Sequence, residues 1–213
     1  MAKRPPKIER RRRILAAARS VFATKGYGGA RMADIATEAG VGKGTLYEHF
    51  KGKEDLFSTL VLNSLREALE GLSPAAASGS PEIVLKQTID YLVQVALVEN
   101  LDLYRLFYDF WDVSAAYRAK TQQPLREAAG RFREAVGEIL RRGQREGVFR
   151  PEIDPVPFAY SLLAAVDGLS LPMAILGDDV DLKRHREWLK ELFVAGVRTE
   201  SALRGASVMG DKS

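Results

Sequence analysis

Cysteine is absent from the 213 residues of this chain. The sequence therefore provides no disulfide framework and no thiolate ligands for a metal ion, as is usual in a reducing compartment. Histidine occurs only at His49 and His185, which are too far apart in sequence to form a local metal-binding pair. We also find no HExxH, GxSxG or complete dinucleotide-binding motif. These absences argue against an enzyme, a metal site or a bound cofactor.

Long uncharged hydrophobic runs are missing as well. A membrane-spanning helix needs about 18 or more consecutive apolar residues, and every apolar stretch of this chain is interrupted sooner. The basic N-terminus resembles the start of a signal peptide, but Arg19 breaks its apolar part and no small-residue cleavage site follows. We therefore expect a soluble cytoplasmic protein with no membrane association.

Positive charge is concentrated at the N-terminal end. Residues 1–56 contain 13 Lys and Arg and 6 Asp and Glu, a net charge of +7, so the remaining 19 basic and 22 acidic residues leave a net charge of −3. A basic module joined to a mildly acidic body predicts that the first part binds a polyanion. A solvated basic tail could account for Lys3 to Arg13, but not for the pattern that follows.

Strand patterns are lacking, because no segment alternates apolar and polar residues between hairpin turns. Apolar residues recur instead at helical spacing, and "SPAAASGS" at 73–80 is the clearest linker. Ser80-Pro81 and Asp154-Pro155 each combine an N-cap residue with a first-turn proline. A loop is expected around Lys120. We predict an all-α protein of about nine helices, near residues 14–26, 32–39, 42–49, 53–71, 81–99, 101–116, 124–146, 155–176 and 182–203.

The string "GKGT" at 42–45 could belong to a phosphate loop of a nucleotide kinase. Such a loop connects a buried strand to a helix, and its glycines let backbone N–H groups converge on phosphates. Here Thr37 occupies the first glycine position of the GxxxxGK[ST] motif, and a helical pattern precedes the loop. A P-loop nucleotide kinase is therefore only a distant alternative.

The same residues fit a helix-turn-helix unit better. Such a unit requires a small residue where its helices cross, a glycine in the turn and apolar residues that hold the second helix to the core. Ala36 meets the first requirement, Gly40 the second, and Ile35, Val41 and Leu46 the third. The stretch "ILAAARSVFATKGYGGARMADIATEAGVGKGTLYEHFKGKEDLF" closely resembles the N-terminal domain of the tetracycline-repressor (TetR) family of bacterial transcriptional regulators.

The resemblance implies a recognition helix over 43–49 that enters the major groove of DNA. Gly44 would allow close approach, Thr45 and Tyr47 would reach phosphates, and Lys51 and Lys53 would clamp the backbone. For each of these lysines a solvated side chain is the alternative reading, and for His49 it is a packing role. The expected DNA-binding residues are Arg31, Lys43, Gly44, Thr45, Tyr47, Glu48, His49, Lys51 and Lys53.

One position departs from the pattern of the family. The family usually has Ser or Thr at the start of the second helix, where this chain has Ala30 and Arg31. The hydroxyl cap and its phosphate contact are therefore in doubt, and Arg31 could replace that contact with a charged one.

The C-terminal part contains an aromatic cluster, since five of the eight residues from Tyr104 to Trp111 are aromatic. They fall on two sides of a helix, so they either pack in the core or line a cavity for an apolar or aromatic ligand, as the resemblance implies. Asp167, alone in an apolar run, either orients a ligand or lies at an interface. The candidate ligand-binding residues are Tyr104, Phe107, Tyr108, Trp111, Phe132, Tyr160, Asp167 and Met173.

Two apolar C-terminal helices predict a homodimer. Small residues in 155–176 permit close helix approach, and 182–203 has its own apolar stripe. These helices form either a four-helix interface between two subunits, which the resemblance also implies, or part of the core of one subunit. The candidate interface residues are Ala164, Ala165, Gly168, Leu189, Leu192, Phe193 and Val197.

We therefore expect a three-helix DNA-binding domain at 1–53 and a helical ligand-sensing and dimerisation domain at 54–213. The expected function is that of a repressor that binds a palindromic double-stranded DNA operator and releases it when a small apolar or aromatic effector binds. A regulator of the same fold without a small ligand is the alternative. The helix near 53–71 is expected to be the only direct covalent connection between the Lys51–Lys53 clamp and the C-terminal body. An effector would therefore act by favouring one placement of this helix over another.

Overall fold

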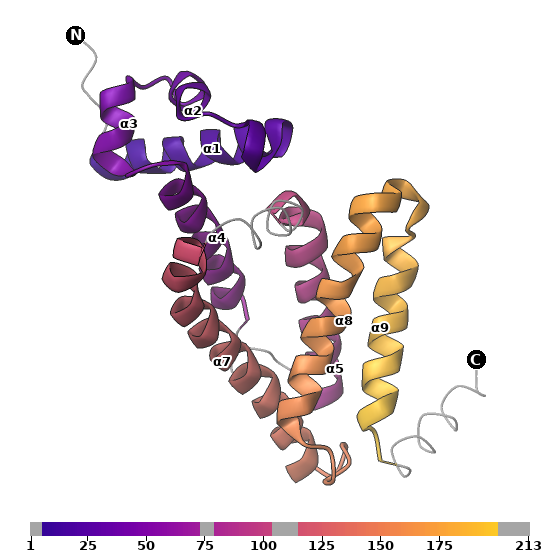
Figure 1. Cartoon of the computed structure of the whole chain (residues 1–213). Helices are drawn as coiled ribbons and strands as arrows, with labels where there is room; N and C mark the ends of the chain where they lie inside the picture. Colours follow the sequence, from indigo (N-terminus) through magenta and orange to yellow (C-terminus); the bar gives the residue numbers. More distant parts are fainter. Residues whose placement is uncertain (1–5, 73–78, 104–114, 200–213) are drawn as a thin grey trace. The chain divides into compact units, whose positions relative to one another are not determined.

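The computed structural model describes residues 6–72, 79–103 and 115–199 (Figure 1). Within these ranges every regular element is a helix, apart from an isolated antiparallel bridge between Phe149 and Arg198. The predicted all-α class is therefore confirmed. The chain divides into two compact units, which we call the first unit (residues 1–66 with 102–126) and the second unit (residues 67–101 with 127–213).

This division differs from the expected boundary after residue 53. Leu56, Phe57 and Leu60 of α4 (Lys53–Glu70) are buried with the N-terminal helices, so the start of α4 belongs to the first unit. The chain re-enters the first unit at residue 102 and leaves it again within α7 (Ala115–Arg145). It therefore passes between the units three times, and the expectation that α4 is the only covalent connection is wrong.

The first unit opens with α1 (Lys7–Gly29), α2 (Met32–Glu38) and α3 (Lys43–His49). α1 begins well before residue 14, where the first helix was predicted to start. Its backbone leaves helical geometry at Gly26 (φ +67°, ψ 168°), near its predicted end, because glycine tolerates positive φ. These helices and α4 enclose one hydrophobic core, whose largest fully buried side chains are Ile14, Phe22, Ile35, Leu46, Phe50, Leu56 and Phe57.

The second unit contains the C-terminal part of α7 and most of the remaining elements: α5 (Pro81–Val93), the π-helix η2 (Gln94–Glu99), α8 (Pro155–Leu176), the 3₁₀ turn η3 (Gly177–Asp179) and α9 (Leu182–Val197). Both predicted N-caps are present. Ser80 Oγ accepts a hydrogen bond from the Ile83 N–H at 3.4 Å, and Asp154 Oδ1 accepts one from the Val156 N–H at 2.8 Å. The helix predicted over 81–99 thus ends as a π-helix.

The loop predicted around Lys120 is wrong, because α7 is continuous from Ala115 to Arg145 and contains Pro124. A proline usually marks the start or a break of a helix, which is why the sequence suggested that a helix begins there. Of the helix predicted over 101–116, residues 101–103 are helical and residues 104–114 lie outside the described ranges.

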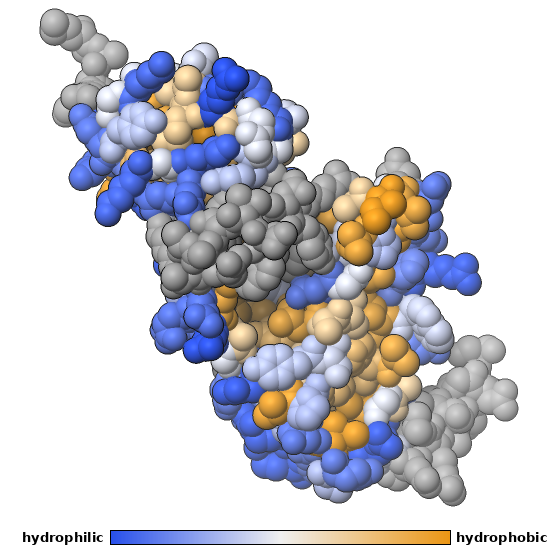
Figure 2. All heavy atoms as spheres, in the orientation of Figure 1, coloured by the Kyte–Doolittle hydropathy of each residue, from blue (hydrophilic) through white to orange (hydrophobic). Residues whose placement is uncertain are grey.

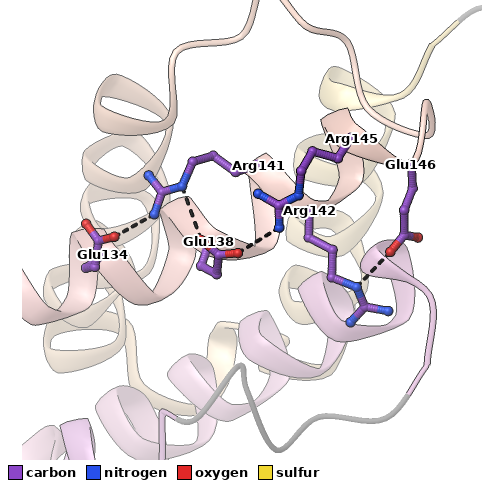
Figure 3. A network of polar contacts seen from close by, with 6 residues as sticks. All are labelled: Glu134, Glu138, Arg141, Arg142, Arg145 and Glu146. Carbon is purple, nitrogen blue, oxygen red and sulfur yellow. Dashed lines mark hydrogen bonds and ion pairs between the residues drawn. The ribbon is translucent and has the colours of Figure 1, made fainter.

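Charged side chains cover an exposed face of α7 (Figure 3). Arg141 contacts Glu134 (Nη2 to Oε1, 2.6 Å) and Glu138 (Nε to Oε2, 3.2 Å), and Arg145 Nη2 lies 2.8 Å from Glu138 Oε1. The hydrogen bonds from Arg145 and Arg141 hold the pKa of Glu138 below its usual value. Exposed pairs of this kind each add little to stability, but Glu138 and Arg141 are one helical turn apart, and such a pair favours the helical backbone of this polar helix.

Ion pairs join α5 to α9. Lys190 Nζ lies 3.0 Å from Asp90 Oδ1, and Arg198 Nε donates to Glu82 Oε2 at 2.9 Å. Partial burial acts to raise the pKa of Glu82, but the hydrogen bonds from Arg198 and Lys86 outweigh it, so this pKa is lowered. Lys190 and the C-cap residue Arg198 therefore hold α9 against α5, whereas Trp188 and Leu192 of α9 are exposed.

Candidate nucleic-acid interface

α2 and α3 form a helix-turn-helix unit. Gly40 in the turn has φ +62°, which L side chains rarely adopt, and the Val41 N–H donates to the Ala36 carbonyl at 3.0 Å. Ala36, the small residue where the two helices cross, is 3% exposed, and Leu46, which holds α3 to the core, is fully buried. The segment before Gly42 is a helix rather than a strand, so the P-loop alternative is wrong.

The side of α3 that faces away from Leu46 is polar. Apart from its chain neighbours and the backbone of its own helix, an added Cβ at Gly44 would meet no atom within 4 Å. Nothing in the described structure therefore requires glycine at this position, whereas close approach to an external surface would. Thr45 is partly buried, and the exposed residues of this face are Lys43, Gly44, Tyr47 and Glu48.

A carboxylate caps the start of α2 in place of a hydroxyl. Lys25 Nζ lies 3.1 Å from Asp34 Oδ2, and the Arg31 N–H donates to the same oxygen at 3.1 Å. These hydrogen bonds, first that of Lys25 and then that of Arg31, lower the pKa of Asp34. The guanidinium of Arg31 has no acceptor and cannot cap a helix. Its side chain is exposed, where it can reach a phosphate.

Lys51 and Lys53 have different surroundings, although both were expected to bind phosphates. The Lys51 side chain is exposed. Lys53 Nζ donates to the carbonyls of Tyr27 at 2.7 Å, Ala30 at 3.1 Å and Gly28 at 3.4 Å. An ammonium group carries three donors, so those of Lys53 are all engaged within the chain. We therefore assign Lys53 to holding α4 against the end of α1, and propose the phosphate contact for Lys51 alone.

His49, at the end of α3, is partly buried. Its ring centroid lies 6.4 Å from that of Phe50. Burial lowers the pKa of His49, and the positive charges of Lys7, Arg10 and Arg11 lower it further. The lowered pKa favours the uncharged imidazole in the free protein.

Sequence reasoning missed several arginines that hold the first unit together. Arg13 Nη2 donates to the Ala39 carbonyl at the end of α2, at 2.9 Å. Arg19 Nε and Nη2 donate to the two carboxylate oxygens of Asp102 at 2.9 and 2.8 Å. The sequence shows Arg19 only as an interruption of an apolar stretch, and no local pattern could identify a partner 83 residues away.

The predicted ligand-binding residues fall into two groups. Tyr104, Phe107, Tyr108 and Trp111 lie outside the described residues. Of the others, Phe132 is buried, Asp167 and Met173 are partly buried, and Tyr160 is 43% exposed on α8. The structure therefore does not bring Tyr160 into the interior of the second unit.

The predicted interface residues are also divided. Leu189 and Val197 are 9% and 1% exposed, so they pack inside the second unit and we leave them out of any contact with a partner. Phe193 is partly buried and packs edge-on against Phe158, with ring centroids 5.6 Å apart. The rest lie at or near the surface: Ala164, Gly168 and Leu192 are exposed and Ala165 is partly exposed.

Comparison with known protein families agrees with this geometry. Residues 14–60 match the model of the bacterial regulatory proteins of the tetR family, and residues 81–197 match the C-terminal model of the BetI-type transcriptional repressors. The second match alone covers more than half of the chain. The chain belongs to the TetR family. It is thus a member of a family of DNA-binding transcriptional regulators with a helix-turn-helix.

Individual proteins resemble this chain over nearly its whole length. The transcriptional regulator TtgR of Pseudomonas putida is 30% identical over 204 residues, which cover 92% of this chain and 95% of TtgR. A transcriptional regulator from Saccharomonospora viridis in complex with choline has a TM-score of 0.76 at 21% identity and covers 91% of this chain and 100% of its own. FadR from Bacillus subtilis in complex with stearoyl-CoA has a TM-score of 0.72 at 22% identity, with coverages of 88% and 99%. At these identities the two structures show the fold alone.

The open surface at Gly44 yields a first prediction. Gly44→Ala should lower affinity for operator DNA roughly tenfold, about 1.4 kcal/mol, because the methyl group keeps α3 from approaching the groove. Thermal stability should stay the same or rise, since alanine favours a helix by up to about 1 kcal/mol over glycine. The control is Gly130→Ala in α7, where an added Cβ also meets nothing within 4 Å and DNA affinity should not change. Wild-type operator affinity in Gly44→Ala would rule out the close approach.

The two lysines yield a second prediction. Lys51→Ala should lower the slope of log K against log salt by about 0.9 and weaken operator and random DNA alike, with an unchanged melting temperature. Lys53→Ala should leave the salt slope unchanged and cost about 1–2 kcal/mol of stability, because carbonyl groups lose their donor. Salt-dependent binding and thermal melting of both variants measure this. If Lys53→Ala has a reduced salt slope and unchanged stability, Lys53 contacts a phosphate and its assignment to the carbonyl groups is wrong.

Proposed function

We propose that this chain is a ligand-responsive repressor, which binds a palindromic DNA operator as a homodimer and releases it when a small molecule binds the part of the chain that follows the DNA-binding helices. The main support is the exposed polar face of α3, with Gly44 open to the outside, within a segment of 13 basic and 6 acidic residues. Repression rather than activation is supported by the match of residues 81–197 to the BetI-type repressors.

The effector half of the proposal rests on the fold and on the aromatic cluster of the sequence. The related structures that hold choline and stearoyl-CoA indicate that proteins of this fold accommodate ligands of very different chemistry. Five aromatic side chains between residues 104 and 111 favour an apolar or aromatic effector here. A regulator of the same fold without a small ligand is the alternative.

The proposed dimer interface is the exposed apolar face of α8 and α9. On α8, Leu171, Ile175 and Leu176 are 49%, 71% and 54% exposed, and on α9, Trp188 and Leu192 are 62% and 57% exposed. Hydrophobic residues gather over α8 in Figure 2. Exposed apolar surface of this kind marks an interaction site, and two helices from each subunit would form a four-helix bundle.

The same exposure makes α8 resemble a membrane span by length and composition. α8 is 22 residues long and strongly apolar, and little of it is buried within the subunit. A second subunit covers such a face without any lipid. We therefore propose the homodimer, rather than a bilayer, as the environment of this helix.

Of the three connections between the units, we propose two as routes from the effector to the DNA-binding helices. One is α4, whose first residue Lys53 is held to the end of α1. The other begins where η2 ends: after Leu101 the chain enters the first unit, where Asp102 pairs with Arg19 of α1 and Leu103 is 5% exposed in the core. We propose that an effector shifts the segment after η2 and thereby moves α1 through the Arg19–Asp102 pair.

Operator selection and linked titrations test the function. In vitro selection with the full chain should return an inverted repeat, whose half-sites are about 34–36 Å apart from centre to centre. A small apolar or aromatic compound found by thermal shift should weaken operator binding about 5–150-fold, and operator should weaken binding of that compound by the same factor. Arg19→Ala should reduce this factor without changing compound affinity in the absence of DNA. Independent binding of compound and operator would refute the sensor role.

The dimer yields a separate prediction. Ile175→Glu should give a monomer in solution and weaken operator binding at least tenfold, because a charge on the apolar face opposes association and a monomer reads one half-site. Ile83→Glu is the matched control, since Ile83 of α5 is also exposed, at 48%, but lies outside the α8–α9 face. Analytical ultracentrifugation without detergent measures the mass. A monomeric Ile175→Glu that binds operator with full affinity would contradict the proposed dimer.

A further inference from the structure

The first turns of α1 carry a concentration of positive charge that lies outside the matched family segment. α1 begins at Lys7, whereas the family match begins at residue 14. The basic residues of this extension are Lys7, Arg10, Arg11, Arg12 and Arg13. They belong to a helix rather than to a solvated tail, so their directions relative to α3 are defined.

Two of these arginines hold the extension against the helix-turn-helix unit. Arg11 Nη1 donates to the His49 carbonyl at 3.4 Å, and its guanidinium lies 4.6 Å from the centre of the Phe50 ring. Arg13 Nη2 donates to the Ala39 carbonyl at 2.9 Å, where α2 ends. The start of α1 is therefore placed beside the C-terminal end of α3.

Lys7, Arg10 and Arg12 differ in the side of the helix that they occupy, and Arg10 is partly buried. Lys7, Arg10 and Arg11 are spaced i, i+3 and i+4 and share one face. Burial is the largest cause that lowers the pKa of His49, and these three positive charges lower it further, against the opposing charge of Glu48. Arg12 lies about 150° around the helix from that face at 100° per residue. Its side chain is 79% exposed, and its Nη1 lies 4.0 Å from Glu9 Oε2.

We propose that Lys7 and Arg10 bind DNA phosphates beside the groove that α3 enters, so that each half-site extends past the bases that α3 reads. This inference rests on the proposed function of α3. Phosphates line both edges of a DNA groove. Cations beside a protein helix that enters the groove therefore lie close to the phosphates of the DNA backbone. These contacts position the protein and add affinity without adding sequence preference.

The first experiment compares two arginines on the same helix. Arg10→Ala should lower the salt slope of operator binding by about 0.9 and weaken operator and random duplex by the same factor. Arg12→Ala makes the same chemical change two residues away, on the side opposite α3, and should leave the slope at the wild-type value. Thermal melting of both full-length variants establishes that each is folded. Equal slopes for Arg10→Ala and the wild type overturn the proposal.

The second experiment locates the contact on the DNA. Neutral methylphosphonate linkages are placed, one at a time, in the backbone that flanks the selected half-site. At one or two of these positions they should weaken binding by the wild type but not further weaken binding by Lys7→Ala or Arg10→Ala, because the same contact is already lost. Equal losses in the wild type and both variants at every flanking linkage overturn the proposal.

Two other outcomes are distinguishable from this one. If base changes in the flanks, rather than methylphosphonates, abolish the difference between the wild type and Arg10→Ala, the extension reads bases and the phosphate assignment is overturned. If the wild type selects no operator at all, the proposed function of α3 fails together with this inference. If the wild type binds its operator and Arg10→Ala does not alter the salt slope, only the proposed phosphate contacts of the extension are refuted, and the proposed function of α3 stands.

Discussion

The seven-residue helix α3 depends on packing for its existence, because a helix this short is not stable in water by itself. Leu46 is fully buried and Phe50 is 1% exposed, and both pack in the hydrophobic core that α1, α2 and α4 enclose. Every residue of α3 that can reach DNA is therefore positioned by this core. A change that loosens the core alters DNA binding without touching a DNA-contacting residue.

Besides the hydrophobic core, charged side chains at the helix ends stabilise the first unit. Arg13 and Lys53 donate to carbonyls at the ends of α2 and α1, and Asp34 accepts from the backbone at the start of α2. Cations at C-termini and anions at N-termini are the arrangement that helix dipoles favour. The basic residues thus divide into those that hold the unit together and those left exposed, such as Lys43 and Lys51. Net charge alone does not separate the two groups.

The path of the chain connects the two units more closely than a simple series of two domains would. Leu103 belongs to the core of the first unit, and Asp102 pairs with α1, although both follow directly on η2 of the second unit. Three crossings between the units constrain any movement of one against the other more than α4 by itself would. In the proposed function, an effector would act by favouring one of two arrangements at these crossings.

Local patterns in the sequence determined the helical class, the helix-turn-helix and its outward residues, and the caps at Ser80 and Asp154, because each depends on neighbours within about one turn. The tertiary structure decided what depends on distant partners. It showed that the donors of Lys53 are engaged within the chain, that Arg19 pairs with Asp102 and that Leu189 and Val197 are interior residues. The physical reason is that burial and hydrogen-bond partners across 26 or 83 residues follow from how helices pack, which periodicity along one helix does not encode.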